Sequence, residues 1–169
     1  MKALVVYESH WGNTEAVARA IAEGIGPEAL ALNTDEAIGP ALEGADLIVA
    51  GAPVIGFALP HERFTKDLAG DSKAPRPADV SHPLLRSWLD ALPPGRGWTA
   101  TFETRIWWSL RGATGTIESK LRQAGYRRLA KAQRFIVNGG YGPLREGELQ
   151  RARRWGADLA EAFASAGPA

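Results

Sequence analysis

The chain contains no cysteine, which excludes disulfide bonds, thiolate catalysis, iron–sulfur clusters and cysteine-type zinc sites. Its three histidines, His10, His61 and His82, lie far apart and lack the spacing of a metal site. We therefore expect each of them on the surface or in a loop. The sequence also lacks a Ser-His-Asp set, a nucleophile elbow and paired acid-base carboxylates, so it does not support hydrolytic catalysis.

Long hydrophobic runs are missing as well. No apolar stretch could span a bilayer, and only five apolar residues lie between Lys2 and Glu8, too few for a secretory signal. We therefore expect a cytoplasmic protein without membrane insertion. The 169 residues, 45% of them hydrophobic, predict a single domain over residues 1–169 with one sizeable core.

Apolar runs and helical periodicity alternate along the chain. Helical spacing of apolar residues is well marked over 13–25, and continuous β-branched runs are typical of buried parallel strands. We predict strands at 2–7, 29–32, 47–50, 99–102 and 135–137, and helices at 13–25, 61–69, 84–92, 114–124 and 146–164. Residues 71–80 should be irregular. This order predicts an α/β fold, a doubly wound five-stranded parallel sheet with helices on both faces.

The most informative stretch is Ser9-His10-Trp11-Gly12-Asn13-Thr14, between the first strand and the first helix. A helix start leaves backbone N–H groups unpaired and carries a partial positive charge, so this polar glycine loop can surround a phosphate without a lysine. A Walker loop would need Gly-Lys-Ser/Thr, and a dinucleotide fingerprint would need further glycines. A simple turn with a capped helix is the alternative.

These residues resemble the phosphate loop of the flavodoxins, which have a Ser or Thr, two variable positions, Gly and a later Thr at the same N-terminal place. Trp11 stands where many flavodoxins carry a second hydroxyl. The resemblance implies the strand order 2-1-3-4-5 and FMN as cofactor. It implies that two further loops enclose the flavin ring, and it points to Pro53, Val54, Ile55, Gly56 and Phe57 in one and Thr101, Phe102, Glu103, Thr104 and Arg105 in the other.

Within those loops the family comparison makes Phe57 and Phe102 candidates for the ring faces, and Gly56 a peptide that could turn toward the flavin. Packing against the sheet is the alternative for Phe57, and a core position is the alternative for Phe102. Glu103 could bind the flavin or form an exposed local cap. For Trp107 and Trp108 we favour a core or dimer-interface role over covering the ring.

Charge is unevenly distributed. Residues 105–154 hold 12 Lys and Arg against 3 Asp and Glu, whereas the rest of the chain holds 8 against 16. If this basic region faces the redox partner protein, the asymmetry predicts an acidic partner, unlike the basic partners of acidic flavodoxins. A solvated basic face is the alternative. Nucleic-acid binding is disfavoured because the basic residues form no recognisable binding module.

The resemblance therefore implies an FMN-binding electron-transfer protein that shuttles electrons between redox partners, as a monomer or homodimer. One alternative is an enzyme of the same fold, either an NAD(P)H-dependent quinone or flavin reductase or a flavodoxin-type protoporphyrinogen oxidase. Another is an interaction module that has lost FMN.

Overall fold

The fold is seen in a computed structural model that describes residues 1–167. Strands and helices alternate as predicted, with the following bounds: β1 (Ala3–Tyr7), α1 (Asn13–Ile25), β2 (Leu30–Asn33), η1 (Gly39–Ala41), β3 (Leu47–Pro53), α2 (Glu62–Ala69), α3 (Leu85–Ala91), β4 (Trp98–Ile106), α4 (Thr114–Gln123), β5 (Arg127–Arg128), β6 (Gln133–Val137) and α5 (Glu148–Ala166).

All strands pair in parallel in one sheet of order β2-β1-β3-β4-β5, which confirms the predicted doubly wound order. The expected fifth strand is longer than the predicted 135–137 and comes in two pieces. β5 pairs with the start of β4 at Trp98 and Thr99, and β6 pairs with its second half, Phe102–Ile106. Both pieces therefore occupy the edge next to β4.

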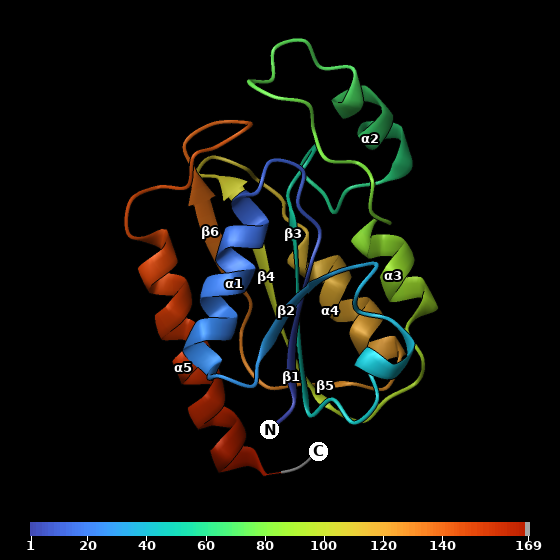
Figure 1. The fold of residues 1–169 in the computed structure, drawn as a ribbon, viewed down its shortest axis with the longest axis vertical. Coiled ribbons are helices and arrows are strands. Elements are labelled where there is room, and N and C mark those ends of the chain that lie inside the picture. The colour runs from blue at the N-terminus through green and yellow to red at the C-terminus, as the bar shows by residue number, and fades with distance from the viewer. Residues whose placement is uncertain (168–169) are drawn as a thin grey trace.

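Helices cover both faces of the sheet, α1 and α5 on one and α3 and α4 on the other (Figure 1). Successive strand residues point to opposite faces, so Val5 and Val49 join the core under α1 and α5, while Leu4 and Ile48 join the core under α3 and α4. Both cores contain fully buried side chains. This two-sided burial explains why the central strands read as continuous apolar runs.

Helices α1 and α5 approach each other closely at two glycines. A Cβ added to Gly156 would overlap the carbonyl oxygen of Ile21, and one added to Gly24 would overlap the carbonyl oxygen of Arg153. The absence of side chains at these two positions lets the backbones touch, which holds both helices against the same face of the sheet.

Strand β4 corrects the prediction for the second ring loop. It extends over Trp98–Ile106 instead of 99–102, pairing with β3 as far as Thr104 and with β6 as far as Ile106. The segment Thr101–Arg105 is therefore buried strand, and the loop that follows is 107–112. The resemblance to flavodoxins had implied a loop here, whereas Glu103 and Arg105 lie in the strand and pair with each other.

The carboxyl ends of β1, β3, β4 and β6 lie at one end of the sheet, where α2 and the long segment 70–84 also lie (Figure 1). This is the end at which doubly wound sheets bind ligands. Among residues 1–167, no helix is long and apolar enough to cross a membrane.

Candidate functional site

The loop between β1 and α1 offers a row of open backbone donors. Gly12 precedes the helix in the left-handed conformation, with φ 83°, and no side chain caps the helix start. Within residues 1–167, the backbone N–H groups of residues 9–15 make no hydrogen bond to a backbone carbonyl. The first turn of a helix has no intrahelical partner for these groups and carries a partial positive charge. The loop is thus built to receive an anion.

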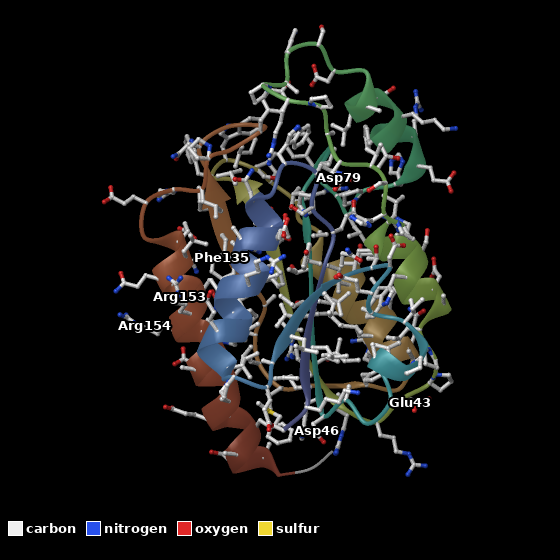
Figure 2. All side chains as sticks on the ribbon, viewed as in Figure 1. Glu43, Asp46, Asp79, Phe135, Arg153 and Arg154 are labelled. Carbon is white, nitrogen blue, oxygen red and sulfur yellow. The ribbon has the colours of Figure 1, made fainter. Side chains whose placement is uncertain are left out.

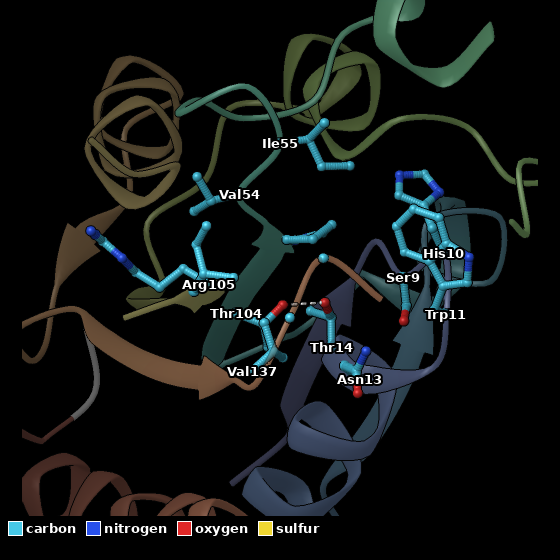
Figure 3. A pocket seen from close by; sticks show the side chains of 14 residues that line it. Ser9, His10, Trp11, Asn13, Thr14, Val54, Ile55, Thr104, Arg105 and Val137 are labelled. Carbon is cyan, nitrogen blue, oxygen red and sulfur yellow. Dashed lines mark hydrogen bonds between the residues drawn. The ribbon is translucent and has the colours of Figure 1, made fainter. Parts of the chain in front are cut away.

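Two side-chain atoms beside this loop are buried without a partner in the described chain. They are Ser9 Oγ and the indole Nε1 of Trp11 (Figure 3). A buried polar group left unpaired costs on the order of 1–3 kcal/mol, so such atoms are rare in the absence of a ligand. A phosphate in the loop would supply acceptors for both the Ser9 hydroxyl and the open N–H groups.

The hydroxyls of Thr14 and Thr104 join α1 to β4 across the pocket (Figure 3). Their Oγ1 atoms lie 2.8 Å apart, and both residues are buried. One hydroxyl donates in this pair, so the other keeps its proton for a ligand. Asn13, the next predicted phosphate ligand, instead donates its side-chain N–H to the carbonyl of Tyr141, 2.9 Å away, and ties the loop to the segment after β6.

A pocket opens at the carboxyl ends of β1, β3, β4 and β6 (Figure 3). Ten of the sequence-predicted residues line it: Ser9, His10, Trp11, Asn13, Thr14, Pro53, Val54, Ile55, Thr104 and Arg105. Four further lining residues were not predicted: Ile106, Val137, Gly139 and Gly140. The Gly139-Gly140 pair, one residue after the last strand, was the available signal, because that strand ends at the same end of the sheet as β1, β3 and β4.

The remaining residues of the expected second ring loop lie elsewhere. Phe102 has no exposed surface and packs edge to face against Phe135 under α1 and α5, with ring centroids 6.1 Å apart. The prediction that Phe102 flanks a ring is therefore wrong, because its side chain points into the core. Thr101 is also buried, and its hydroxyl donates to Glu118.

Glu103 does cap a helix, but from a fully buried position rather than an exposed loop. Its Oε2 accepts from the backbone N–H groups of Ala113 and Thr114, at 2.6 and 3.0 Å, where α4 begins. Its Oε1 accepts from Arg105 Nη1 at 2.9 Å. Arg105 therefore brings a largely neutralised positive charge to the pocket wall.

The β3–α2 loop turns sharply at Gly56 and Phe57, which both adopt left-handed backbone conformations with φ 57° and 63°. This conformation is unusual for a bulky residue such as Phe57. Its side chain neither lines the pocket nor packs onto the sheet. It is 43% exposed and meets the ring of Trp108 at a centroid distance of 6.0 Å.

The loop after β4 covers residues 107–112, beyond the segment that the sequence indicated as a loop. Trp107 is 74% exposed and Trp108 is 53% exposed. A core role for this pair is therefore wrong, and a dimer-interface role stays a prediction. Their neighbour Leu110 is 91% exposed. The end of β4 shows that the two tryptophans directly follow Ile106, which lines the pocket.

The irregular segment 70–84 crosses the outside of the β1–α1 loop. Arg76 Nη2 donates to the carbonyl of Trp11 at 2.6 Å, and the hydroxyl of Tyr141 donates to Asp71 at 2.6 Å. His10 lies in a loop, as predicted, but it is only 5% exposed, because its ring bonds to the backbone carbonyl of Asp79 in this segment. The sequence pattern did not place this segment against the loop.

No model of a known protein family and no curated protein sequence matches this chain. Solved structures do match its fold. A flavodoxin from the domain Archaea superposes with a TM-score of 0.67 at 24% identity, covering 95% of this chain and 97% of that one. Oxidised flavodoxin 1 from Bacillus cereus gives a TM-score of 0.66 at 18% identity, covering 96% and 99%.

A third similar structure is the rubredoxin oxygen:oxidoreductase from Desulfovibrio gigas, with a TM-score of 0.64 at 16% identity. The match covers 97% of this chain but 35% of that larger protein, so the likeness concerns one part of it. At these identities the comparisons establish the architecture and leave the activity open. This chain therefore has the flavodoxin fold.

Proposed function

We propose that this protein binds FMN in the pocket at the carboxyl ends of β1, β3 and β4 and carries electrons between redox partners. The observation that supports this most strongly is the buried, unpartnered Ser9 Oγ beside the open N–H groups of residues 9–15. Together they form a cradle of donors that lacks only its acceptor. The similarity to solved flavodoxins agrees with a phosphorylated flavin as that ligand.

In this proposal the phosphate lies against Ser9, the amides of residues 10–14 and the Thr14–Thr104 hydroxyl pair. The flavin ring lies between the β3–α2 loop, through Pro53, Val54 and Ile55, and the wall made by Arg105 and Ile106. The bound flavin would accept and release one or two electrons, and the protein would orient it and set the polarity around it.

Ser9→Ala tests the phosphate cradle. Because the hydroxyl has no partner in the described chain, its removal should leave the apoprotein as stable as the wild type or slightly more stable. The same change should weaken FMN about ten-fold and leave riboflavin nearly unaffected, since charge-assisted hydrogen bonds are worth roughly 1.5–3 kcal/mol. Ser87→Ala, on the exposed side of α3, is the matched control. Equal losses for both flavins would contradict the assignment.

The visible spectrum of the purified protein distinguishes the alternatives. Flavin absorbance near one equivalent per chain would support the proposal, and a protein that neither contains nor takes up FMN would be an interaction module instead. Oxidation of NADPH by the pure protein with a quinone present would identify an enzyme rather than a carrier.

We further propose that electron-transfer partners dock on the rim formed by Phe57, Trp107, Trp108 and Leu110. This apolar surface is exposed, Trp107 directly follows the pocket-lining Ile106, and Arg111 in the same loop is exposed as well. An acidic partner surface with an apolar centre would be complementary to it. The predicted basic region 105–154 does not form one face, since Arg127 and Arg128 lie against the start of β4, at the opposite end of the sheet.

Small charged oxidants can measure the charge at this rim. Reoxidation of the flavin-loaded protein by anionic ferricyanide should slow in Arg111→Glu, and reoxidation by cationic hexaamminecobalt should speed up, with both effects fading as salt rises. Arg127→Glu, at the far end of the sheet, should change neither rate appreciably. Equal sensitivity to both substitutions would contradict a rim-centred docking surface.

A further inference from the structure

Glu8 and His10, at the start of the β1–α1 loop, form a buried pair of ionisable side chains. His10 Nε2 lies 2.9 Å from Glu8 Oε1, and the two side chains are only 3% and 4% exposed. His10 Nδ1 lies 2.7 Å from the backbone carbonyl oxygen of Asp79. The second carboxylate oxygen, Glu8 Oε2, accepts from the backbone N–H of Leu85 at 2.7 Å, where α3 begins.

These contacts restrict where the protons can be. The carbonyl of Asp79 can only accept, so His10 Nδ1 must carry a proton. Glu8 Oε2 already accepts an N–H, so any proton on Glu8 has to be on Oε1, facing His10 Nε2. Either the histidine is an imidazolium beside a carboxylate, or a neutral histidine accepts from a protonated Glu8. In both forms the pair holds one proton between Nε2 and Oε1.

Loss of that proton would leave two lone pairs facing each other in a buried place. Burial alone lowers the pKa of His10, but hydrogen bonds to Glu8 and to the Asp79 carbonyl outweigh it and bring that pKa above its ordinary value. A raised pKa of His10 agrees with its contacts to Glu8 and to the Asp79 carbonyl, which both require protonated ring nitrogens or a shared proton. The pair thus keeps a net charge of zero near neutral pH, where a deprotonated pair would be negative.

Other charged groups face His10 from the far side. A hollow behind the loop is lined by Glu15 and Arg19 of α1, Glu36 after β2, and Asp79 and His82 of the crossing segment. The Asp79 carboxylate accepts from Ser81, and His82 bonds to Asp35 at 2.7 Å. Acidic groups therefore predominate around His10, and they favour the protonated pair.

His10 also lines the ligand pocket, next to Ser9 and Thr14. A group of changing charge at this place acts on a bound phosphate through a short, buried path, where screening by solvent is weak. Arg105, the cation on the pocket wall, is bound to Glu103, and Arg76 lies outside the loop on the Trp11 carbonyl.

We propose that the Glu8–His10 pair is the proton-holding element of the phosphate site, so that a dianionic phosphate binds the protonated pair tightly and the deprotonated pair weakly. The inference rests on the proposed phosphate site but not on the flavin or on electron transfer. His10 acts as a positioning residue in this arrangement, since it also holds the segment around Asp79 against the loop. Its partner Glu8 does the same for the start of α3.

The first experiment follows the His10 ring nitrogens of the ¹⁵N-labelled apoprotein by NMR as pH is raised. We expect both ring nitrogens to be protonated or proton-sharing at neutral pH, with a titration midpoint above the ordinary value of about 6.5. Inorganic phosphate should move the midpoint upward, because binding and protonation are linked. A singly protonated ring titrating at or below the ordinary value, or a midpoint indifferent to phosphate, would overturn the proposal.

The second experiment measures FMN and riboflavin affinity between about pH 7 and pH 9, where the FMN phosphate stays dianionic. FMN should weaken about ten-fold across this range, which corresponds to a shift of one pH unit in the midpoint, and riboflavin should not. In His10→Gln the pH dependence should vanish, and in the control His82→Gln it should persist. The reverse pattern would exclude His10 as the titrating group.

The experiments distinguish a failure of the proposed flavin function from a failure of the proposed Glu8–His10 role. If FMN does not bind, the proposed function is wrong, and the phosphate-dependent NMR titration still decides whether His10 and Glu8 serve an anion site. Glu8→Gln provides a second variant, in which the His10 midpoint should fall because the negative partner is gone.

Discussion

Thr14 and Thr104 are separated by 90 positions in the sequence, and their hydroxyl oxygens lie 2.8 Å apart in a buried contact between the first turn of α1 and β4. The contact joins the β1–α1 loop to the strand that carries Arg105 into the pocket wall. Removing either hydroxyl should therefore change both the stability of the protein and the affinity of the pocket for its ligand.

Thr14→Ala should lower the free energy of unfolding by about 1 kcal/mol, the usual value for one buried hydrogen bond. It should also weaken FMN about ten-fold, while riboflavin binding changes little. Urea unfolding and flavin fluorescence titration measure the two effects, and Thr14→Ser should restore both. If Thr14→Ser behaves like Thr14→Ala, the methyl group rather than the hydroxyl is responsible.

Gly156→Ala tests the contact between α1 and α5. The new Cβ would overlap the Ile21 carbonyl oxygen, so the helices must move apart, and overpacking of this kind costs roughly 1–3 kcal/mol. The matched control is Gly115→Ala in α4, where an added Cβ meets nothing within 4 Å. The control should be neutral or up to about 1 kcal/mol more stable, because alanine favours the helix. Similar urea midpoints for both variants would contradict the close contact.

Glu103→Gln should be strongly destabilising. The substitution removes the negative charge from a fully buried position that pairs with Arg105 and caps α4. Breaking one partner of a buried ion pair typically costs about 3–5 kcal/mol. Glu118→Gln, at a partly exposed pair with Arg128, should cost less than about 1 kcal/mol. Chemical unfolding of both variants provides the measurement, and a small loss in Glu103→Gln would show that Arg105 finds another partner.

His82 should make stability depend weakly on pH. Its hydrogen bond to Asp35 raises the pKa of the folded-state imidazole above the ordinary value. The stabilisation is therefore complete below about pH 6.5 and is lost as pH rises through the folded-state pKa. Because the side chain is 38% exposed, salt screens the pair and a few tenths of a kcal/mol are expected.

Urea midpoints between about pH 5.5 and pH 8.5 test this prediction. Both His82→Gln and Asp35→Asn should remove the same part of the pH dependence, since each breaks the same pair. A different loss in the two variants would show that His82 responds to Asp79, 3.6 Å away, instead.

The sequence alone predicted the α/β class and the position of the first loop. Continuous apolar strands and helical spacing are local patterns, and residues 13–25 form the helix that the pattern predicts. The polar glycine loop after β1 could be recognised because its function depends on consecutive residues. Its role in holding a phosphate stays a prediction.

Tertiary structure decided where β4 ends and what its charged residues do. Glu103 and Arg105 look like loop residues in a linear reading, because a lone charge in a central strand would be too costly to bury. Each is tolerated because the other neutralises it and because α4 starts beside Glu103. β4 therefore continues to Ile106, the loop begins at 107, and Phe102 lies in the core.

Only the folded chain also brings the segment around Asp79 against His10, across 69 positions of sequence. The spacing of apolar residues cannot predict such a contact, because the contact depends on how an irregular segment crosses the end of the sheet. Local sequence thus determined the elements and the position of the polar glycine loop. Long-range packing decided which side chains reach the pocket, because burial and charge pairing depend on neighbours in space.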